Sequence, residues 1–201
     1  MKFLIGKKLG MTTLFDEERG ALNMTLIECE ENTVVMKRTL EKNGYLAVAV
    51  EAPKTARKTV TKEFRFDKGR RPEEKVELAK AVDALEIGSN PTVEAFELGE
   101  KVHICGTTKA KGFQGVVKRH GFKGAGPGHG HKHDSRKPGS IGATFPEHVI
   151  KGRRMAGRMG GEKMTVKNLE IVFIDAEKKL LGVRGAVPGV IGRLVQIVAA
   201  K

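Results

Sequence analysis

Three histidines, His129, His131 and His133, alternate along the chain, and their type and spacing could suit a metal ion. Alternate residues of an extended segment share a face, so two or three imidazoles could converge. Structural zinc sites usually take four ligands and commonly include a cysteine. Both cysteines are far away in the sequence, and Asp134 is the nearest carboxylate. We therefore expect no functional metal site.

The glycine-rich sequence around these histidines could instead cradle a nucleotide. The run GAGPGHG (Gly124–Gly130) has glycine at every second position, but His129 stands where the third glycine of GxGxxG would be. No GxxxxGK[ST] motif follows it. No carboxylate pair, Ser–His–Asp set or Cys–His pair can be argued from the spacing. We therefore expect no catalytic residues, no cofactor and no enzymatic activity.

Lysine and arginine set this region apart from the rest of the chain. Between Lys111 and Arg158, eleven Lys or Arg stand against two acids, a local charge of +9 within a total of +13. Cationic side chains neutralise phosphates and release counterions. Glycine lets the backbone approach closely, and histidine can stack on bases or donate to phosphate. The composition predicts an arm that binds nucleic acid and takes its shape from it. The alternative is a solvated basic linker, which leaves Phe113, Ile141 and Phe145 unexplained.

Short strands on both sides of the arm must hold it. The β-rich runs lie at spacings of about ten residues, which predicts a small antiparallel barrel or sandwich. Asp175–Lys178 has the polar composition of a hairpin turn. The runs are Thr25–Arg38, Tyr45–Ala52, Val93–Thr108 (in two parts, broken at Gly99), Thr165–Gly185 and Leu194–Ala199. Between Val117 and Met164 about 45 residues show no periodicity, which is too long for an ordinary loop. Such a segment is disordered or is ordered by a partner.

The remaining stretches are less distinctive. Glu73–Gly88 fits a helix or a strand, and Lys54–Pro72 is basic and predicts an exposed loop or a short excursion. Cys29 and Cys105 lie far apart in apolar, strand-like settings, so we expect two free thiols in a reducing cytosol. There is no run of eighteen apolar residues and no signal-peptide pattern at the start, so we expect no membrane segment.

Five blocks of the sequence resemble the bacterial type of one family, large ribosomal subunit protein three. They occur in the family's order between residues 3 and 197. The blocks are FLIGKKLGMT (Phe3–Thr12), GTTKAKGFQGVVKRHGF (Gly106–Phe122), SRKPGSIG (Ser135–Gly142), KGRRMAGRMGGEKMTVKNLEIV (Lys151–Val172) and RGAVPGVIGRLVQI (Arg184–Ile197).

This resemblance implies a mainly β fold: a translation-protein-type antiparallel β-barrel with a long basic Gly-rich extension and a small α/β or irregular excursion. Residues 1–53, 89–116 and 164–201 would form the barrel core. Residues 54–88 would form the excursion, where the match to the family is poor. Residues 117–163 would form the RNA-threading central extension, with its tip among Ser140–Pro146 and Met155–Gly160.

The resemblance also implies a role as a structural constituent of the large ribosomal subunit in the cytoplasm. The protein would bind 23S-type rRNA near its 3′ end, help nucleate assembly and extend an arm toward the peptidyl-transferase centre. Large-subunit proteins fourteen and nineteen would be neighbours, and no membrane contact or homo-oligomer is expected. A non-specific nucleic-acid-binding or chaperone module is the alternative.

The expected RNA contacts are mostly to phosphate and sugar. The barrel would dock through surface lysines such as Lys7, Lys8 and Lys109. The full set of candidate RNA-binding residues is Lys7, Lys8, Lys109, Lys111, Lys118, Arg119, His120, Lys123, His129, His131, Lys132, Arg136, Lys137, Lys151, Arg153, Arg154 and Arg158.

Overall fold

A computed structural model describes residues 2–55, 57–67 and 71–200. The chain divides into two compact units: unit 1 is Met1–Thr107 with Lys163–Lys201, and unit 2 is Thr108–Glu162. The fold is mainly β with antiparallel pairing, as the sequence predicts. Among the described residues, the helices are too short and too polar to cross a membrane.

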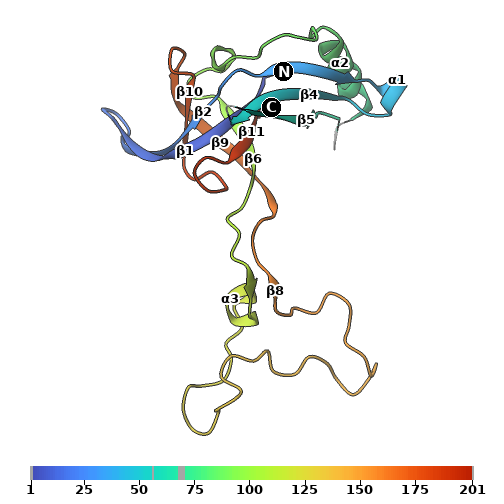
Figure 1. Ribbon diagram of the computed structural model, residues 1–201, viewed down its shortest axis with the longest axis vertical. Coiled ribbons are helices and arrows are strands. Elements are labelled where there is room, and N and C mark those ends of the chain that lie inside the picture. Colours follow the sequence, from blue (N-terminus) through green and yellow to red (C-terminus); the bar gives the residue numbers. More distant parts are fainter. Residues whose placement is uncertain (1, 56, 68–70, 201) are drawn as a thin grey trace. The chain divides into compact units, whose positions relative to one another are not determined.

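Six strands of unit 1 form one antiparallel sheet that closes on itself in the order β1-β11-β6-β9-β10-β2 (Figure 1). The strands are β1 (Phe3–Asp16), β2 (Gly20–Glu28), β6 (Lys101–Thr107), β9 (Lys163–Asp175), β10 (Leu180–Arg184) and β11 (Leu194–Ala199). The first strand pairs with the last, with Phe3 opposite Val198, and also with β2. Alternate apolar residues of these strands, such as Leu4, Ile104 and Ile197, fill the interior, where each is at most 1% exposed.

A second sheet of unit 1 has the order β3-β4-β5. Its strands are β3 (Thr33–Arg38), β4 (Ala47–Thr55) and β5 (Lys58–Arg65), with the one-turn helix α1 (Leu40–Asn43) between β3 and β4. Phe64 of β5 packs in the same buried cluster as Phe3 and Ile5 of β1. The expected loop over Lys54–Pro72 is therefore wrong in part, because pairing with β4 and the burial of Phe64 and Phe66 hold this polar run as a strand.

Two further segments test the helix and strand predictions. The ambiguous stretch Glu73–Gly88 contains helix α2 (Pro72–Asp83), which buries Val82 fully but leaves Val76 58% exposed. The first strand predicted within Val93–Thr108 is wrong: Val93–Ala95 is a 3₁₀ turn, η1. Val93 and Phe96 are both buried, and their spacing of three suits a 3₁₀ turn rather than the alternation of a strand.

Polar side chains fix two of the turns. Asp175–Lys178 forms the predicted hairpin turn between β9 and β10, and the Asp175 Oδ1 accepts the Lys178 N–H at 3.0 Å. Asn32 joins β2 to β3 and is buried, and its amide exchanges two hydrogen bonds with the backbone of Ile5 at 2.9 and 3.0 Å. Both cysteines are free, as predicted: Cys29 is buried and Cys105 partly exposed.

Candidate nucleic-acid interface

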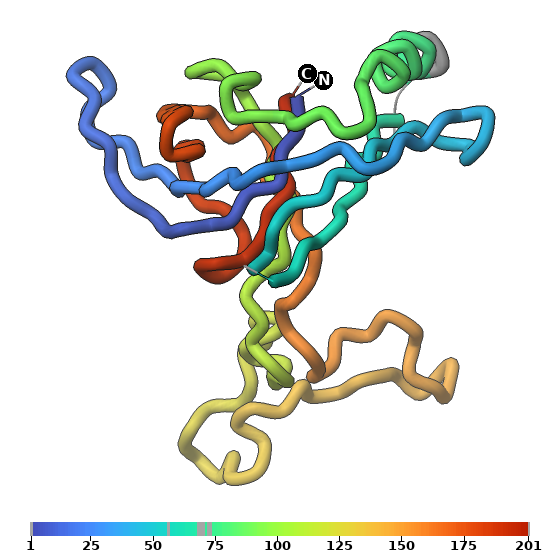
Figure 2. Tube along the Cα trace, turned by 45° about the horizontal axis from the view of Figure 1, so that its top comes forward, coloured from blue at the N-terminus to red at the C-terminus, as the bar shows by residue number. Residues whose placement is uncertain are grey.

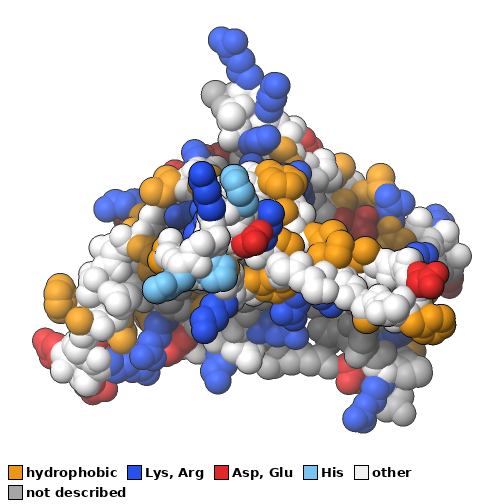
Figure 3. Space-filling model, turned by 90° about the horizontal axis from the view of Figure 1, so that it is seen from below, with side chains coloured by type: hydrophobic (Ala, Val, Ile, Leu, Met, Phe, Trp, Pro, Cys, Tyr) orange, Lys and Arg blue, Asp and Glu red, His pale blue; other side chains and the backbone are white. Residues whose placement is uncertain are grey.

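Unit 2 concentrates the positive charge of the molecule. By sequence it holds 12 Lys or Arg and 3 acids, whereas unit 1 holds 25 and 21. Within Thr108–Glu162, all of which the structure describes, Val116 is the one buried side chain, at 3% exposure. Figure 3 shows Lys and Arg side chains standing around a group of histidines. A surface of this kind cannot be stabilised by its own apolar burial, so it suits a polyanionic partner.

Part of unit 2 nevertheless has regular structure. We call this part the neck, residues 108–121 and 155–162. It contains β7 (Phe113–Gln114) paired with β8 (Gly157–Arg158), and the short helix α3 (Val116–His120). Three backbone hydrogen bonds of 2.9 Å join its two segments. They run from Thr108 N–H to Glu162 O, from Lys111 N–H to Met159 O, and from Met159 N–H to Gly112 O.

Glycine permits this close pairing at one position in particular. Gly160 has φ +73°, and a Cβ there would collide with the carbonyl oxygen of Lys109. Only glycine fits without moving the backbone of the opposite chain. The expected tip position for Met155–Gly160 is therefore wrong, since this stretch pairs with Lys109–Gln114 at the start of unit 2.

Cationic side chains surround a hollow of about 480 Å³ in the neck. Lys109, Lys111, Arg119, His120 and Arg158 line it, with Glu162 as the one acidic side chain in the lining. The Arg119 Nη1 and the His120 Nε2 both lie against the Met155 carbonyl oxygen, at 2.6 and 3.0 Å. A carbonyl can only accept, so the His120 ring donates from Nε2. The lining lysines and arginines form no ion pair with any described residue, which leaves their charge available to an anion.

The rest of unit 2, residues 122–154, has only local turns, and we call it the distal segment. The Asp134 N–H donates to His131 O, and Asp134 pairs with Lys137 at 3.0 Å. The Arg153 Nη2 donates to Ser140 O at 2.7 Å, the contact that joins its later part to its earlier part. The three alternating histidines are exposed, and the structure brings no group of three metal-ligating side chains together among the described residues.

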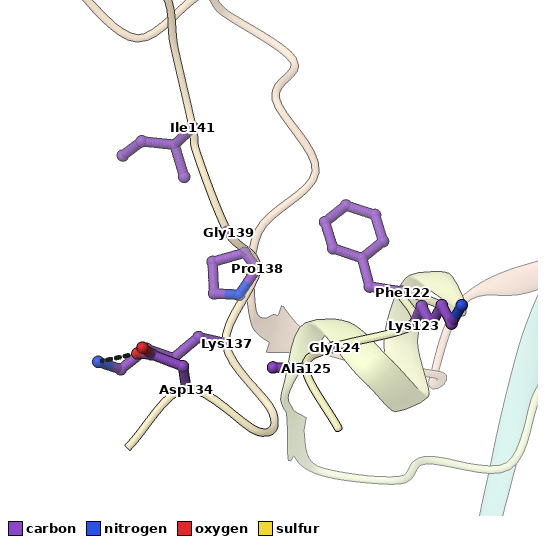
Figure 4. A pocket seen from close by; sticks show the side chains of 9 residues that line it. All are labelled: Phe122, Lys123, Gly124, Ala125, Asp134, Lys137, Pro138, Gly139 and Ile141. Atoms are coloured by element: carbon purple, nitrogen blue, oxygen red, sulfur yellow. Dashed lines mark ion pairs between the residues drawn. The ribbon is translucent and has the colours of Figure 1, made fainter. Parts of the chain in front are cut away.

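An open hollow of about 920 Å³ lies within the distal segment (Figure 4). Phe122 comes from the start of the segment, and Pro138 and Ile141 come from its middle. Lys123 and Lys137 also line it, the latter in its ion pair with Asp134. The hollow therefore combines apolar surface with cations, a combination that stacked bases and their phosphates can use.

Fifteen of the seventeen candidate RNA-binding residues lie in unit 2, and the other two are on β1 in unit 1. Lys7 is partly exposed and lies 3.9 Å from Glu28. The description of Lys8 as a surface residue is wrong: it is 8% exposed, and its ammonium donates to Val187 O at 2.7 Å and Gly189 O at 3.2 Å. Those carbonyls are remote in sequence, so no local pattern could reveal this role.

Sequence reasoning also placed no functional residue on the β4–β5 hairpin. The run PKTARKTVTK, Pro53–Lys62, holds four cations and no acid. Lys54, Arg57, Lys58 and Lys62 are all exposed. The absence of acids from this run was the signal that could have identified them.

Comparison with known proteins gives one consistent result. The family model described as "Ribosomal protein L3" matches residues 3–183. Three similar proteins are each named "Large ribosomal subunit protein uL3". That of Leifsonia xyli subsp. xyli is 48% identical over 199 residues, which cover 96% of this chain and 91% of the relative. That of Desulforudis audaxviator is 42% identical over 99% of this chain and 95% of the relative. That of Halorhodospira halophila is 39% identical over 94% of this chain and 93% of the relative.

Proposed function

The chain belongs to the ribosomal protein L3 family, and from this we propose that it is a structural constituent of the bacterial large ribosomal subunit in the cytoplasm. It acts by binding large-subunit rRNA and not by catalysing a reaction. The observation that carries the proposal is unit 2, with its 12 cations against 3 acids and one buried side chain.

The physical mechanism is charge neutralisation by a segment with little structure of its own. The neck fixes one cluster of cations around its hollow, and the distal segment takes its shape from the RNA helices between which it lies. A segment of 33 residues that runs out and back reaches at most about 50 Å at about 3.3 Å per residue. That reach allows it to bring positive charge between phosphates that would otherwise repel one another.

The finer parts of the proposal rest on the family resemblance together with the charge of unit 2. They are binding near the 3′ end of 23S-type rRNA, a role in nucleating assembly, and an arm directed toward the peptidyl-transferase centre. They also include contacts with large-subunit proteins fourteen and nineteen. Of the seventeen candidate RNA contacts we retain sixteen and assign Lys8 a structural role. The extension over residues 117–163 and the translation-protein type of the barrel belong to the same proposal.

Charge removal in unit 2 tests the proposal. Replacing Arg153, Arg154 and Arg158 together with glutamine should lower the slope of log affinity against log salt for an rRNA transcript by about 2–3 units. A control variant in which the exposed Lys42, Lys80 and Lys178 are changed to glutamine loses the same charge from unit 1 and should keep the slope. An unchanged slope in the arginine variant would refute the proposal.

Co-sedimentation separates a ribosomal constituent from a loose polyanion binder. A constituent stays with the large subunit in moderate salt, whereas a chaperone-like module is released. Release of the wild-type chain under those conditions would favour the chaperone alternative.

A further inference from the structure

The β4–β5 hairpin carries the net charge of unit 1. Unit 1 holds 25 cations and 21 acids, a net charge of +4. The ten residues Pro53–Lys62 carry +4 by themselves, so the other residues of unit 1 together are neutral. Lys54, Arg57, Lys58 and Lys62 are exposed side chains at the end of a paired hairpin, where Ala52 is opposite Val60 and Val50 is opposite Lys62.

Among the described residues, seven other cations of unit 1 are held in ion pairs with acids. Ion pairs involve Lys2, Lys7, Arg19, Arg38, Arg65, Lys179 and Arg184. Among the described residues, the four hairpin cations have no such partner. The acid nearest to them on β5 is Glu63, which is directed to Arg38 at 3.8 Å and to the Tyr45 hydroxyl at 3.4 Å. The hairpin charge is therefore available to an external anion.

The hairpin lies at the place where unit 1 is joined to unit 2. Lys62 lines a hollow of about 300 Å³ in unit 1 together with Thr107 and Lys163. Thr107 and Lys163 are opposite each other on β6 and β9, and they are the residues at which the chain leaves unit 1 and returns to it. Figure 2 shows the hairpin end (cyan) beside these strand ends. Lys62 of the hairpin therefore lies next to the residues at which the chain passes from unit 1 into unit 2.

The hairpin holds its cations in a defined place. Phe64 anchors β5 in the core at 3% exposure, and β4 fixes the register of Lys58 and Lys62. Exposed Thr59 and Thr61 add hydroxyl donors, which also bind phosphate oxygens. Apart from proline and alanine, Val60 is the one apolar residue of Pro53–Lys62, and its side chain is partly buried. The surface thus lacks the exposed apolar face by which a basic segment inserts into a membrane.

We infer that Lys54, Arg57, Lys58, Lys62 and Lys163 form a second RNA-binding surface, on unit 1, which contacts backbone phosphates of the same RNA that unit 2 binds. This inference rests on the proposed function and adds a binding surface to it. The ammonium and guanidinium groups of these residues, with the neighbouring threonine hydroxyls, can donate to phosphate oxygens, and such contacts carry no sequence information. We call this set the hairpin patch.

A charge-matched pair of variants tests the hairpin patch in the full-length chain. The test variant changes Lys54, Arg57, Lys58 and Lys62 to glutamine. The control changes four exposed lysines elsewhere in unit 1, Lys42, Lys80, Lys101 and Lys178. With an rRNA transcript, the slope of log affinity against log salt should be about 3 units lower for the test variant, because each of the four lost phosphate contacts contributes about 0.7–0.9. For the control variant the slope should change by less than about 1 unit. Thermal unfolding midpoints equal to that of the wild type show that both variants are folded.

The outcomes separate this inference from the proposed function. If the hairpin variant keeps the wild-type slope while the arginine variant of unit 2 loses it, the hairpin patch is refuted and the proposed function stands. If the salt slope is unchanged in both variants, the hairpin patch and the proposed function are both refuted. If the hairpin variant keeps its slope for RNA but no longer joins the large subunit, the patch binds an acidic protein, and the RNA assignment is wrong.

A second measurement needs no substitution. Acetylation of amines in the wild-type chain, read by mass spectrometry, should fall at least about fivefold at Lys58 and Lys62 when the rRNA transcript is added. Lys80 and Lys178 serve as internal references that should not change. Equal modification of Lys58 and Lys62 with and without RNA would overturn the inference.

Discussion

Replacing Gly160 with alanine should open the neck, whereas the same change at Gly112 should only weaken it. Both glycines have left-handed backbones, with φ of +73° and +69°. Alanine costs about 1–2 kcal/mol in that region. The two sites differ in what a Cβ would meet: at Gly160 it collides with the backbone oxygen of Lys109, and at Gly112 nothing lies within 4 Å. Gly112→Ala therefore isolates the conformational cost, and Gly160→Ala adds the collision.

The size of the effect follows from the backbone bonds of the neck. Each of the three bonds that join its two chains contributes about 1 kcal/mol. In the Gly112→Ala variant a loss of about 1–2 kcal/mol should lower the protection of neck amides about 5- to 30-fold. Gly160→Ala must also move the two segments of the neck apart at Lys109, and this breaks about two of the three backbone hydrogen bonds. The total of about 3 kcal/mol or more should remove protection almost completely.

Amide hydrogen exchange on the full-length, RNA-free chain measures this directly. The amides of Lys111 and Met159 report on the neck, and the amides of β6 and β11 serve as the internal reference for unit 1. Equal loss of protection in both variants would refute the argument that the close approach at Gly160 holds the neck. Free exchange of Lys111 and Met159 in the wild type would refute the ordered neck itself.

Two further predictions concern buried groups of unit 1. Lys8→Met leaves the carbonyls of Val187 and Gly189 without their donor, so the free energy of unfolding should fall by about 1–3 kcal/mol while the salt slope of RNA binding stays unchanged. A lower slope with unchanged stability would restore Lys8 as an RNA contact. Burial raises the pKa of Cys29 to about 12, so its thiol stays protonated and unreactive at pH 8, whereas the partly exposed Cys105 should react. A thiol-exchange reagent should count one thiol in the native chain and two in denaturant; two in the native chain would contradict this.

The sequence predicted the mainly β fold because its strand signals are local. Tyr45–Ala52 and Thr165–Gly185 are rich in strand-forming residues, and the polar turn at Asp175–Lys178 separates two apolar runs. Segments that depend on distant partners were missed. The polar strand β5 needs β4 beside it, and the turn at Val93–Ala95 follows the shape of the core that Val93 and Phe96 enter.

The candidate interface was predictable to a similar extent and for a similar reason. Composition alone identified unit 2, because a run of cations and glycines without apolar periodicity is visible in one dimension. Its internal order was not visible, since the Met155 carbonyl that Arg119 and His120 contact lies about 35 residues away. The burial of Lys8 likewise depends on carbonyls about 180 residues further along the chain.

The pairing of the first strand with the last determines the order of events during synthesis. Strand β1 (Phe3–Asp16) cannot find β11 (Leu194–Ala199) until nearly the whole polypeptide has been made. At about 5–20 residues per second, Glu162 precedes Leu194 by about 2–6 s. The cationic middle of the nascent chain therefore leaves the translating ribosome while the six-stranded sheet is still open, so under the proposed function it is accessible to RNA before the rest of the protein has folded.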